Sequence, residues 1–268
     1  MSDRAMRRPR MRRRRPPRQW LLAWVLLGVA APAVAAPLQV AVASNFLAPL
    51  EALAEAFADD GGETLQISAG ATGQLYTQIT HGAPYDLLMA ADQARPQRLV
   101  DQGLARAASR ITYARGQLVL WARPGIPLPA EGLAGLSRAS VSRLAIANPA
   151  LAPYGRAARQ ALQATGLWST LGDRIVQGQN VSQAFQYLAT GNVSHALVAA
   201  SYTRLDNRPD GAHQTIDAQW HAPVRQDAVI LERTDSREAA SAFLAFMQGP
   251  SAARILKRFG YRPMDASH

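Results

Sequence analysis

Four short turns carry the residues of this chain whose types and spacing could bind an anion. Each turn follows a run of apolar residues, contains hydroxyl, amide or glycine residues, and precedes a helical pattern. The turns are Ser44-Asn45, Ala71-Thr72-Gly73, Pro153-Tyr154-Gly155 and Asn180-Val181. The first N–H groups of a helix have no partner within the helix and carry a partial positive charge. Several such turns that point at one place would form an anion site.

Capping is the simpler explanation for any one of these turns, because Ser, Thr and Asn are favoured residues at the start of a helix. Four turns, two in each half of the chain, favour a second interpretation, in which opposing helix ends meet at one small anion. Ligands of α/β sheets bind beyond the carboxyl ends of the strands, where these turns would lie. Both interpretations stay open from the residues alone.

Other chemistries find little support in the sequence. It lacks the G-x-S-x-G, H-E-x-x-H, G-x-x-x-x-G-K-[ST] and G-x-G-x-x-G patterns of common catalytic and nucleotide sites. The five histidines have no metal-ligand spacing, and without cysteine there is no disulfide or thiolate catalysis. The alternative of a different class is a secreted serine hydrolase that uses Ser44 or Thr72, although only His81 near Asp86 suggests a dyad.

The elements that must position these turns alternate between strand and helix. Residues Leu47, Leu50, Leu53 and Phe57 recur three to four positions apart, as on one face of a helix. Strand, polar turn and helix in repeated order predict parallel βαβ units. We therefore expect an α/β protein of two lobes, each a mostly parallel sheet flanked by helices. The predicted strands are 38–43, 64–68, 87–90, 117–122, 144–147, 175–176, 195–200 and 228–231.

The positive charge of the chain is concentrated at its N-terminus. Of a net charge of +10 over 268 residues, the first 35 residues supply +8, from nine arginines and one aspartate, which leaves +2 for the rest. A nearly neutral body has no overall field for a polyanion, so nucleic acid is excluded as a leading partner. The basic stretch, the apolar stretch Trp20–Ala31 and Ala33-Val34-Ala35 together predict a signal peptide, residues 1–35, cleaved after Ala35. An exported, cysteine-free domain suits the periplasm.

Three stretches resemble a known family. Residues 82–92 read G-A-P-Y-D-L-L-M-A-A-D, residues 249–261 read G-P-S-A-A-R-I-L-K-R-F-G-Y, and residues 43–46 read A-S-N-F. They are similar to the G-A-P-x-D-[LV]-x-x-x-A-D segment, the C-terminal G-P-x-A-x-x-[IL]-[LF]-x-x-[FY]-G-[FY] segment and the A-[ST]-N-F variant of the periplasmic molybdate-binding proteins of ABC transporters. The resemblance covers residues 37–265 in order.

The resemblance implies a periplasmic-binding-protein fold with a ligand cleft between lobes. Lobe 1 would comprise 36–115 with 222–268 and lobe 2 would comprise 116–221, joined by hinges near 113–117 and 221–226. The family's ligand contacts fall on Ser44, Asn45, Thr72, Tyr154 and Val181, the last two through backbone N–H groups. A ligand-binding tyrosine of the A-S-L variant is replaced by Ala199, so Asn45 or Tyr202 would take its place.

The residue types of this set bear on the ligand. None of the five positions is acidic, and protonated phosphate benefits from a carboxylate that accepts its remaining proton. None is basic, although carboxylate ligands usually meet an arginine. Donors alone suit a fully ionised oxyanion such as molybdate, tungstate or sulfate, and the resemblance favours molybdate. It further implies a monomer without a cofactor, in which molybdenum is held only as the oxyanion, and an ABC-transporter permease as its partner. A sulfate-binding protein is the alternative within the class.

Overall fold

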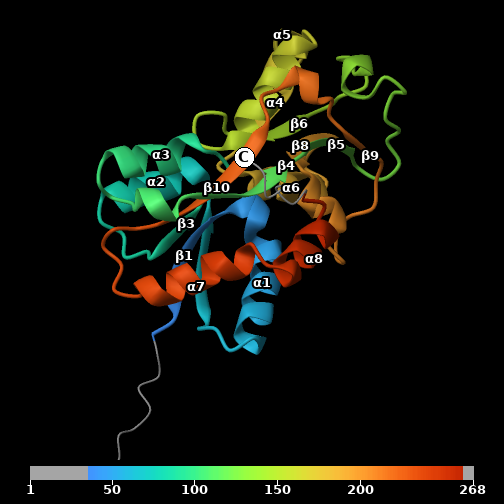
Figure 1. The fold of residues 1–268 in the computed structure, drawn as a ribbon. Coiled ribbons are helices and arrows are strands. Elements are labelled where there is room, and N and C mark those ends of the chain that lie inside the picture. The colour runs from blue at the N-terminus through green and yellow to red at the C-terminus, as the bar shows by residue number, and fades with distance from the viewer. Residues whose placement is uncertain (1–35, 262–268) are drawn as a thin grey trace, which may run out of the picture. The chain divides into compact units, whose positions relative to one another are not determined.

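A computed structural model describes residues 36–261 of the chain. The predicted signal peptide and its cleavage after Ala35 lie outside the described residues. Two five-stranded sheets organise the described part, and each has helices packed against it (Figure 1). The two-lobed α/β architecture is therefore confirmed.

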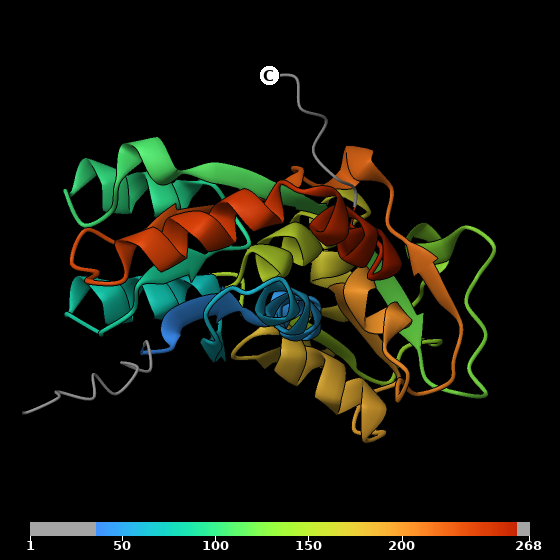
Figure 2. The ribbon, with the colours of Figure 1, turned by 60° about the horizontal axis from the view of Figure 1, so that its bottom comes forward.

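The first sheet, with its helices, forms lobe 1, and its strand order is β2-β1-β3-β10-β4. Helices α1, α7 and α8 cover one face over an aromatic core, and α2 and α3 cover the other (Figure 2). The strands are β1 (Leu38–Ala43), β2 (Leu65–Gly70), β3 (Leu87–Met89), β4 (Ile111–Gly116) and β10 (Val224–Ile230). The helices are α1 (Leu47–Asp59), α2 (Thr72–Thr80), α3 (Ala94–Asp101), α7 (Arg237–Met247) and α8 (Pro250–Arg258).

The second sheet forms lobe 2 in the order β7-β6-β8-β5-β9. Its strands are β5 (Leu118–Ala122), β6 (Leu144–Ala147), β7 (Ile175–Gly178), β8 (His195–Ala199) and β9 (His213–Thr215). Its helices are α4 (Pro153–Ala164), α5 (Leu167–Leu171) and α6 (Val181–Ala189). Six 3₁₀ turns complete the described part: η1 (Ser44–Phe46), η2 (Ala107–Ser109), η3 (Gly132–Gly135), η4 (Gly172–Arg174), η5 (Ala200–Arg204) and η6 (Ala218–Trp220).

The sheets are mixed, whereas the sequence predicted mostly parallel sheets. In lobe 1, β1 pairs in parallel with β2 and β3, but β10 runs antiparallel to β3 and β4. In lobe 2, β6 pairs in parallel with β7 and β8, but β5 runs antiparallel to β8 and β9. The antiparallel strands flank the two chain segments that pass between the lobes. Since one segment leaves lobe 1 and the other returns to it, the strands β4 and β10 must run in opposite directions.

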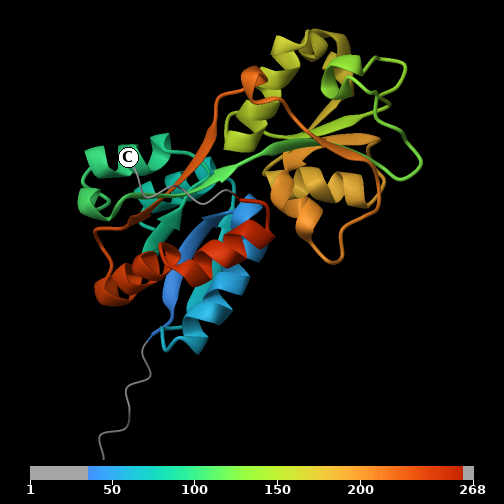
Figure 3. The ribbon, with the colours of Figure 1, turned by 45° about the vertical axis from the view of Figure 1, so that its right-hand side comes forward.

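Two segments join the lobes and lie side by side (Figure 3). The chain leaves the first sheet with β4 and enters the second with β5 after the single residue Gln117. It returns between the end of β9 and the start of β10. The residue bounds predicted for the lobes, 36–115 with 222–268 and 116–221, remain a prediction from sequence.

Candidate functional site

In lobe 1, two of the predicted turns lie next to each other at one edge of the sheet. Strands β1 and β2 are parallel, with Ala43 paired to Gly70, so the chain leaves both strands at the same level. The turn η1 begins immediately after β1, and α2 begins at Thr72, two residues after β2. The exit of β3 joins them, because the Ala91 N–H donates to Thr72 Oγ1 at 3.0 Å.

Lobe 2 repeats this arrangement. Strands β6 and β7 are parallel, with Ala147 paired to Gly178, and they lead to the starts of α4 and α6. Tyr154 is the second residue of α4, and Val181 is the first residue of α6. The Asn180 side chain caps α6 by accepting a hydrogen bond from the Gln183 N–H at 3.0 Å.

Contacts between the lobes bring the two edges together. The Gly73 N–H, in the first turn of α2, donates to the Leu151 carbonyl just before α4 at 2.8 Å. In addition, η1 packs against both α6 and η5. Alanines at the exits of β1, β2 and β3 belong to the same apolar cluster as the core of lobe 2. The structure therefore brings all four predicted turns to the surface where the lobes meet.

All five predicted ligand residues are buried at that surface. Their exposed fractions are at most 6%: Ser44, Asn45, Thr72, Tyr154 and Val181. Thr72, Tyr154 and Val181 occupy first-turn positions of helices, where the backbone N–H has no partner within the helix. Helix N–H groups that lack a partner within the helix and lie together on a buried surface favour an anion.

The side chains of Thr72 and Asn45 differ in what they can offer. Among the hydrogen bonds of the described residues, Thr72 is only an acceptor, so its hydroxyl proton is available to a further group. The Asn45 amide donates to Gln226 Oε1 at 2.8 Å and to the Tyr261 hydroxyl at 2.9 Å. These two bonds use both amide protons, which leaves the backbone N–H as the Asn45 donor.

Tyr202 does reach the first turn from the other lobe. Its hydroxyl donates to the Ser44 carbonyl at 3.1 Å, so it approaches the turn at a carbonyl oxygen. Burial raises the pKa of Tyr202 well above its ordinary value, and the hydroxyls of Ser182 and Ser44 partly offset this shift. The phenol therefore stays protonated, and a donor, throughout the neutral range.

A buried polar cluster joins this turn to the crossing strands. Tyr113 and Asn45 both donate to the side-chain oxygen Oε1 of Gln226, but the side-chain nitrogen Nε2 of Gln226 has no partner among the described residues. A Cβ at Gly116 would collide with the Tyr154 hydroxyl and lie 2.9 Å from that nitrogen. The Tyr154 side chain thus rests directly on the backbone of β4, where only glycine leaves room.

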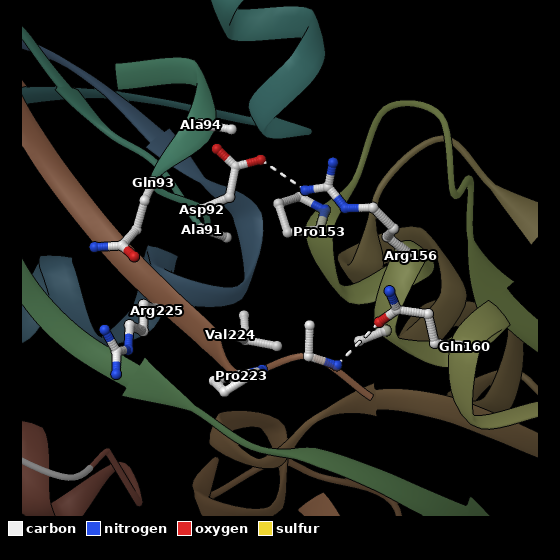
Figure 4. A pocket seen from close by; sticks show the side chains of 12 residues that line it. Ala91, Asp92, Gln93, Ala94, Pro153, Arg156, Gln160, Pro223, Val224 and Arg225 are labelled. Carbon is white, nitrogen blue, oxygen red and sulfur yellow. Dashed lines mark hydrogen bonds and ion pairs between the residues drawn. The ribbon is translucent and has the colours of Figure 1, made fainter. Parts of the chain in front are cut away.

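Asp92 forms ion pairs near the surface where the lobes meet. Asp92, which is 8% exposed, accepts from Arg95 in lobe 1 and from Arg156 of α4 at 2.8 Å. Figure 4 shows Asp92 and Arg156 bonded directly to each other where they line a cavity of about 210 Å³ beside the returning strand. None of the five predicted ligand residues lines this cavity. We interpret the Asp92–Arg156 ion pair as a contact that holds the two lobes together.

Sequence reasoning did not assign roles to Gly73, Ser201, Gln226 or Tyr261. Ser201 and Tyr261 both donate to the Asn45 carbonyl, at 2.8 and 2.9 Å. Tyr261 is the last residue of the C-terminal motif at 249–261, so the sequence indicated its position but not its role. The signal that could have identified Gly73 is its position in the first turn of a helix, because glycine is unfavourable in helices.

No base stands beside the hydroxyls that a hydrolase would use. Within residues 36–261, no hydrogen bond joins Ser44 or Thr72 to a histidine, carboxylate or lysine. His81 bonds to the Thr77 carbonyl and is exposed at the end of α2. Over the same range there is no cluster of three or more potential metal ligands, and no helix has the length and hydropathy to cross a membrane.

A family model for "bacterial extracellular solute-binding protein" matches residues 38–262. The chain belongs to this family of solute-binding proteins. It is 41% identical over 235 residues to the molybdate-binding protein ModA of Azotobacter vinelandii, which covers 87% of this chain and 92% of the relative. It is 36% identical over 237 residues to ModA of Rhodobacter capsulatus, over 88% of this chain and 92% of the relative.

A solved structure supports the same assignment. The periplasmic molybdate-binding protein of Azotobacter vinelandii superposes with a TM-score of 0.80 at 37% identity and covers 85% of this chain and all of that chain. Small-molecule sites occur preferentially where two domains meet. The four buried turns lie at that place.

Proposed function

We propose that this protein captures molybdate, and also tungstate, outside the cytoplasm and delivers it to the membrane permease of an ABC-type importer. It acts as a periplasmic monomer after cleavage behind Ala35. It needs no cofactor, and molybdenum enters only as the bound oxyanion. The ligand contacts are Ser44, Asn45, Thr72, Tyr154 and Val181.

The observation that carries this proposal is the meeting of four donor turns, two from each lobe, on one buried surface. The five contacts include no acidic or basic side chain. Monoprotonated phosphate would leave its own proton without an acceptor there, whereas molybdate at neutral pH only accepts. The two molybdate-binding relatives support molybdate over sulfate.

Native mass spectrometry can test the choice of ligand. The cleaved protein is offered an equimolar mixture of molybdate, tungstate, sulfate and phosphate. We expect one equivalent of molybdate or tungstate per chain, and no displacement by a hundredfold excess of sulfate. Retention of sulfate in place of molybdate would establish the alternative within the class. Absence of any bound oxyanion would refute the proposal.

A matched pair of variants tests the site. Thr72→Ala removes a hydroxyl that faces the ligand, and donors to a charged acceptor contribute about 1.5–3 kcal/mol each. We expect molybdate affinity to fall about ten- to a hundredfold. Val181→Ala keeps its backbone N–H and should bind within about threefold of the unaltered protein. Equal losses in both variants, measured by calorimetric titration, would contradict the assigned donors.

A further inference from the structure

The turn η1 combines backbone and side-chain donors. It spans Ser44–Phe46, and the Leu47 N–H donates to the Ser44 carbonyl. Three side-chain hydroxyls also donate to carbonyls of this turn. Tyr202 donates to the Ser44 carbonyl at 3.1 Å, and Ser201 and Tyr261 donate to the Asn45 carbonyl at 2.8 and 2.9 Å.

These hydroxyls act on the peptide groups that face the ligand. A trans peptide is planar, and its C=O and N–H point in opposite directions. The Ser44 carbonyl and the Asn45 N–H belong to one peptide group, so Tyr202 behind the turn fixes the direction of the N–H in front of it. A hydrogen bond accepted at the carbonyl also polarises the peptide and strengthens its N–H as a donor.

In the turns at α2 and α6, backbone donors of the same helix hold the corresponding carbonyls. In α2, the carbonyl of Ala71 accepts from the N–H groups of Gln74 and Leu75 at 2.9 and 3.0 Å. In α6, the carbonyl of Asn180 accepts from the Ala184 N–H at 3.3 Å. The peptide groups that present the Thr72 and Val181 donors are therefore held by their own helices.

We propose that Ser201 and Tyr202 are positioning residues that link closure of the lobes to the orientation of the turn that presents the Asn45 N–H, Tyr202 through the Ser44–Asn45 peptide and Ser201 through the following Asn45–Phe46 peptide; this inference rests on the proposed function. Both belong to η5 of lobe 2, whereas the turn they hold belongs to lobe 1. Their hydrogen bonds exist only when the lobes meet. Tyr202 thus orients the Asn45 N–H from the far side of the turn and does not itself contact the ligand.

The surroundings of Tyr202 fit this role. Its ring stacks on Phe185 of α6, with centroids 4.5 Å apart and planes 5° from parallel. Phe185 in turn packs against Trp121 of β5 at 5.6 Å. This stack fixes the phenol ring within lobe 2, so the hydroxyl is already in place when lobe 1 arrives.

Calorimetry and stopped-flow measurements with molybdate test the inference on Tyr202→Phe, Ser201→Ala and the double variant. Phenylalanine keeps the stack on Phe185 and removes only the hydroxyl. A hydrogen bond contributes about 0.5–1.5 kcal/mol, so each single variant should bind about three- to tenfold more weakly, with faster dissociation. The double variant should lose more than either single variant. Tyr85→Phe, which loses one exposed hydrogen bond to Gln78, is the matched control and should bind normally.

A structural role would change different quantities. We expect the urea midpoint of the unliganded variants to stay unchanged, because the inter-lobe bonds form only on closure, and we expect Ser201→Thr to retain affinity. Unchanged affinity in the double variant overturns the inference alone, and so does a loss of affinity matched by an equal loss of unliganded stability. If the unaltered protein takes up no oxyanion, the proposed function falls and the positioning role falls with it.

Discussion

The two lobes present their donors in different ways. In lobe 2, the start of α6 is complete in itself, because Asn180 caps the helix and the helix holds its own first peptide group. In lobe 1, the turn η1 depends on the hydroxyls of Ser201 and Tyr202 from the opposite lobe and of Tyr261 from the end of the chain.

This difference indicates that half of the site is formed before the ligand arrives. A ligand can shift a conformational equilibrium only through contacts that differ between the two states. The donors of lobe 2 are available in both states, whereas those of η1 are completed when the lobes close. Variants within the body of lobe 2 should therefore lower the stability of the unliganded protein. Variants at the surface where the lobes meet should instead lower the affinity for the ligand.

The largest effect is expected from Gly155→Ala in lobe 2. A Cβ at this position of α4 would collide with the carbonyl oxygen of Ala147 and lie 2.7 Å from its carbon. Both atoms are backbone, so α4 must move away from β6, at a cost of about 3 kcal/mol. We expect urea unfolding to show this loss without ligand, and molybdate affinity to fall more than a hundredfold. Normal unliganded stability would show that the α4 turn is not preformed.

Gly73→Ala tests the lobe surface in the same way. A Cβ at Gly73 would lie 2.9 Å from the Leu151 carbonyl oxygen, an atom of the other lobe. We expect molybdate affinity to fall about tenfold or more, since closure is obstructed. The unliganded protein should keep its stability or gain up to about 1 kcal/mol, because alanine favours a helix over glycine. A loss of unliganded stability like that of Gly155→Ala would mean that the lobes meet before ligand binds.

Much of this arrangement could be predicted from local sequence. The predicted strands 38–43 and 144–147 match β1 and β6, and all four predicted turns stand at or beside helix starts. Short-range periodicity carries this information. Two strands, β4 and β9, were not predicted. Both lie at sheet edges. All three residues of β9 are exposed, so no buried face imposes a pattern on it, whereas the buried residues of β4 do not alternate regularly with exposed ones.

The partners of the site residues could not be predicted in this way. Tyr261 is 216 positions from Asn45 in the chain, and Ser201 is 156 positions away. No local sequence pattern relates these residues, and each is a common residue type that most often has a purely structural role. The commitment of the Asn45 amide to Gln226 likewise depends on how β10 returns to lobe 1. Sequence therefore indicated the donor turns, and only the structure showed what orients them.

Asn180→Ala should give a smaller effect than the glycine variants. In contrast to Tyr202→Phe, it should lower the stability of the unliganded protein and leave molybdate affinity nearly unchanged. It removes the cap of α6 and leaves the Val181 N–H in place. Loss of an N-cap costs about 1 kcal/mol, so we expect a corresponding fall in the unliganded free energy of unfolding. Molybdate affinity should change by less than about threefold. Asn180→Ser, which can still accept from the Gln183 N–H, should restore stability. An affinity loss without a stability loss would break the contrast between the lobes.

The smallest expected effect is the contribution of one histidine of lobe 2 to the pH dependence of stability. His195 begins β8 and is fully buried, with Nδ1 3.0 Å from Ser194 Oγ and no partner for Nε2 among the described residues. Burial lowers its pKa below the ordinary value of about 6.5. The unfolded chain therefore takes up this proton first, so the His195 contribution to stability is complete above about pH 6.5 and is lost as pH falls through the lower folded pKa.

We expect the melting temperature of the unliganded protein to fall between pH 7 and pH 5, with His195 contributing part of that fall. His195→Asn should lower stability at pH 7 and flatten this dependence, because it removes the titrating ring. His81→Asn, at an exposed position, is the control and should leave the slope as it is. Since His195 belongs to the preformed lobe, acid should act on the unliganded protein. A pH slope seen only in the molybdate complex, and unchanged in His195→Asn, would assign the acid sensitivity to the surface between the lobes.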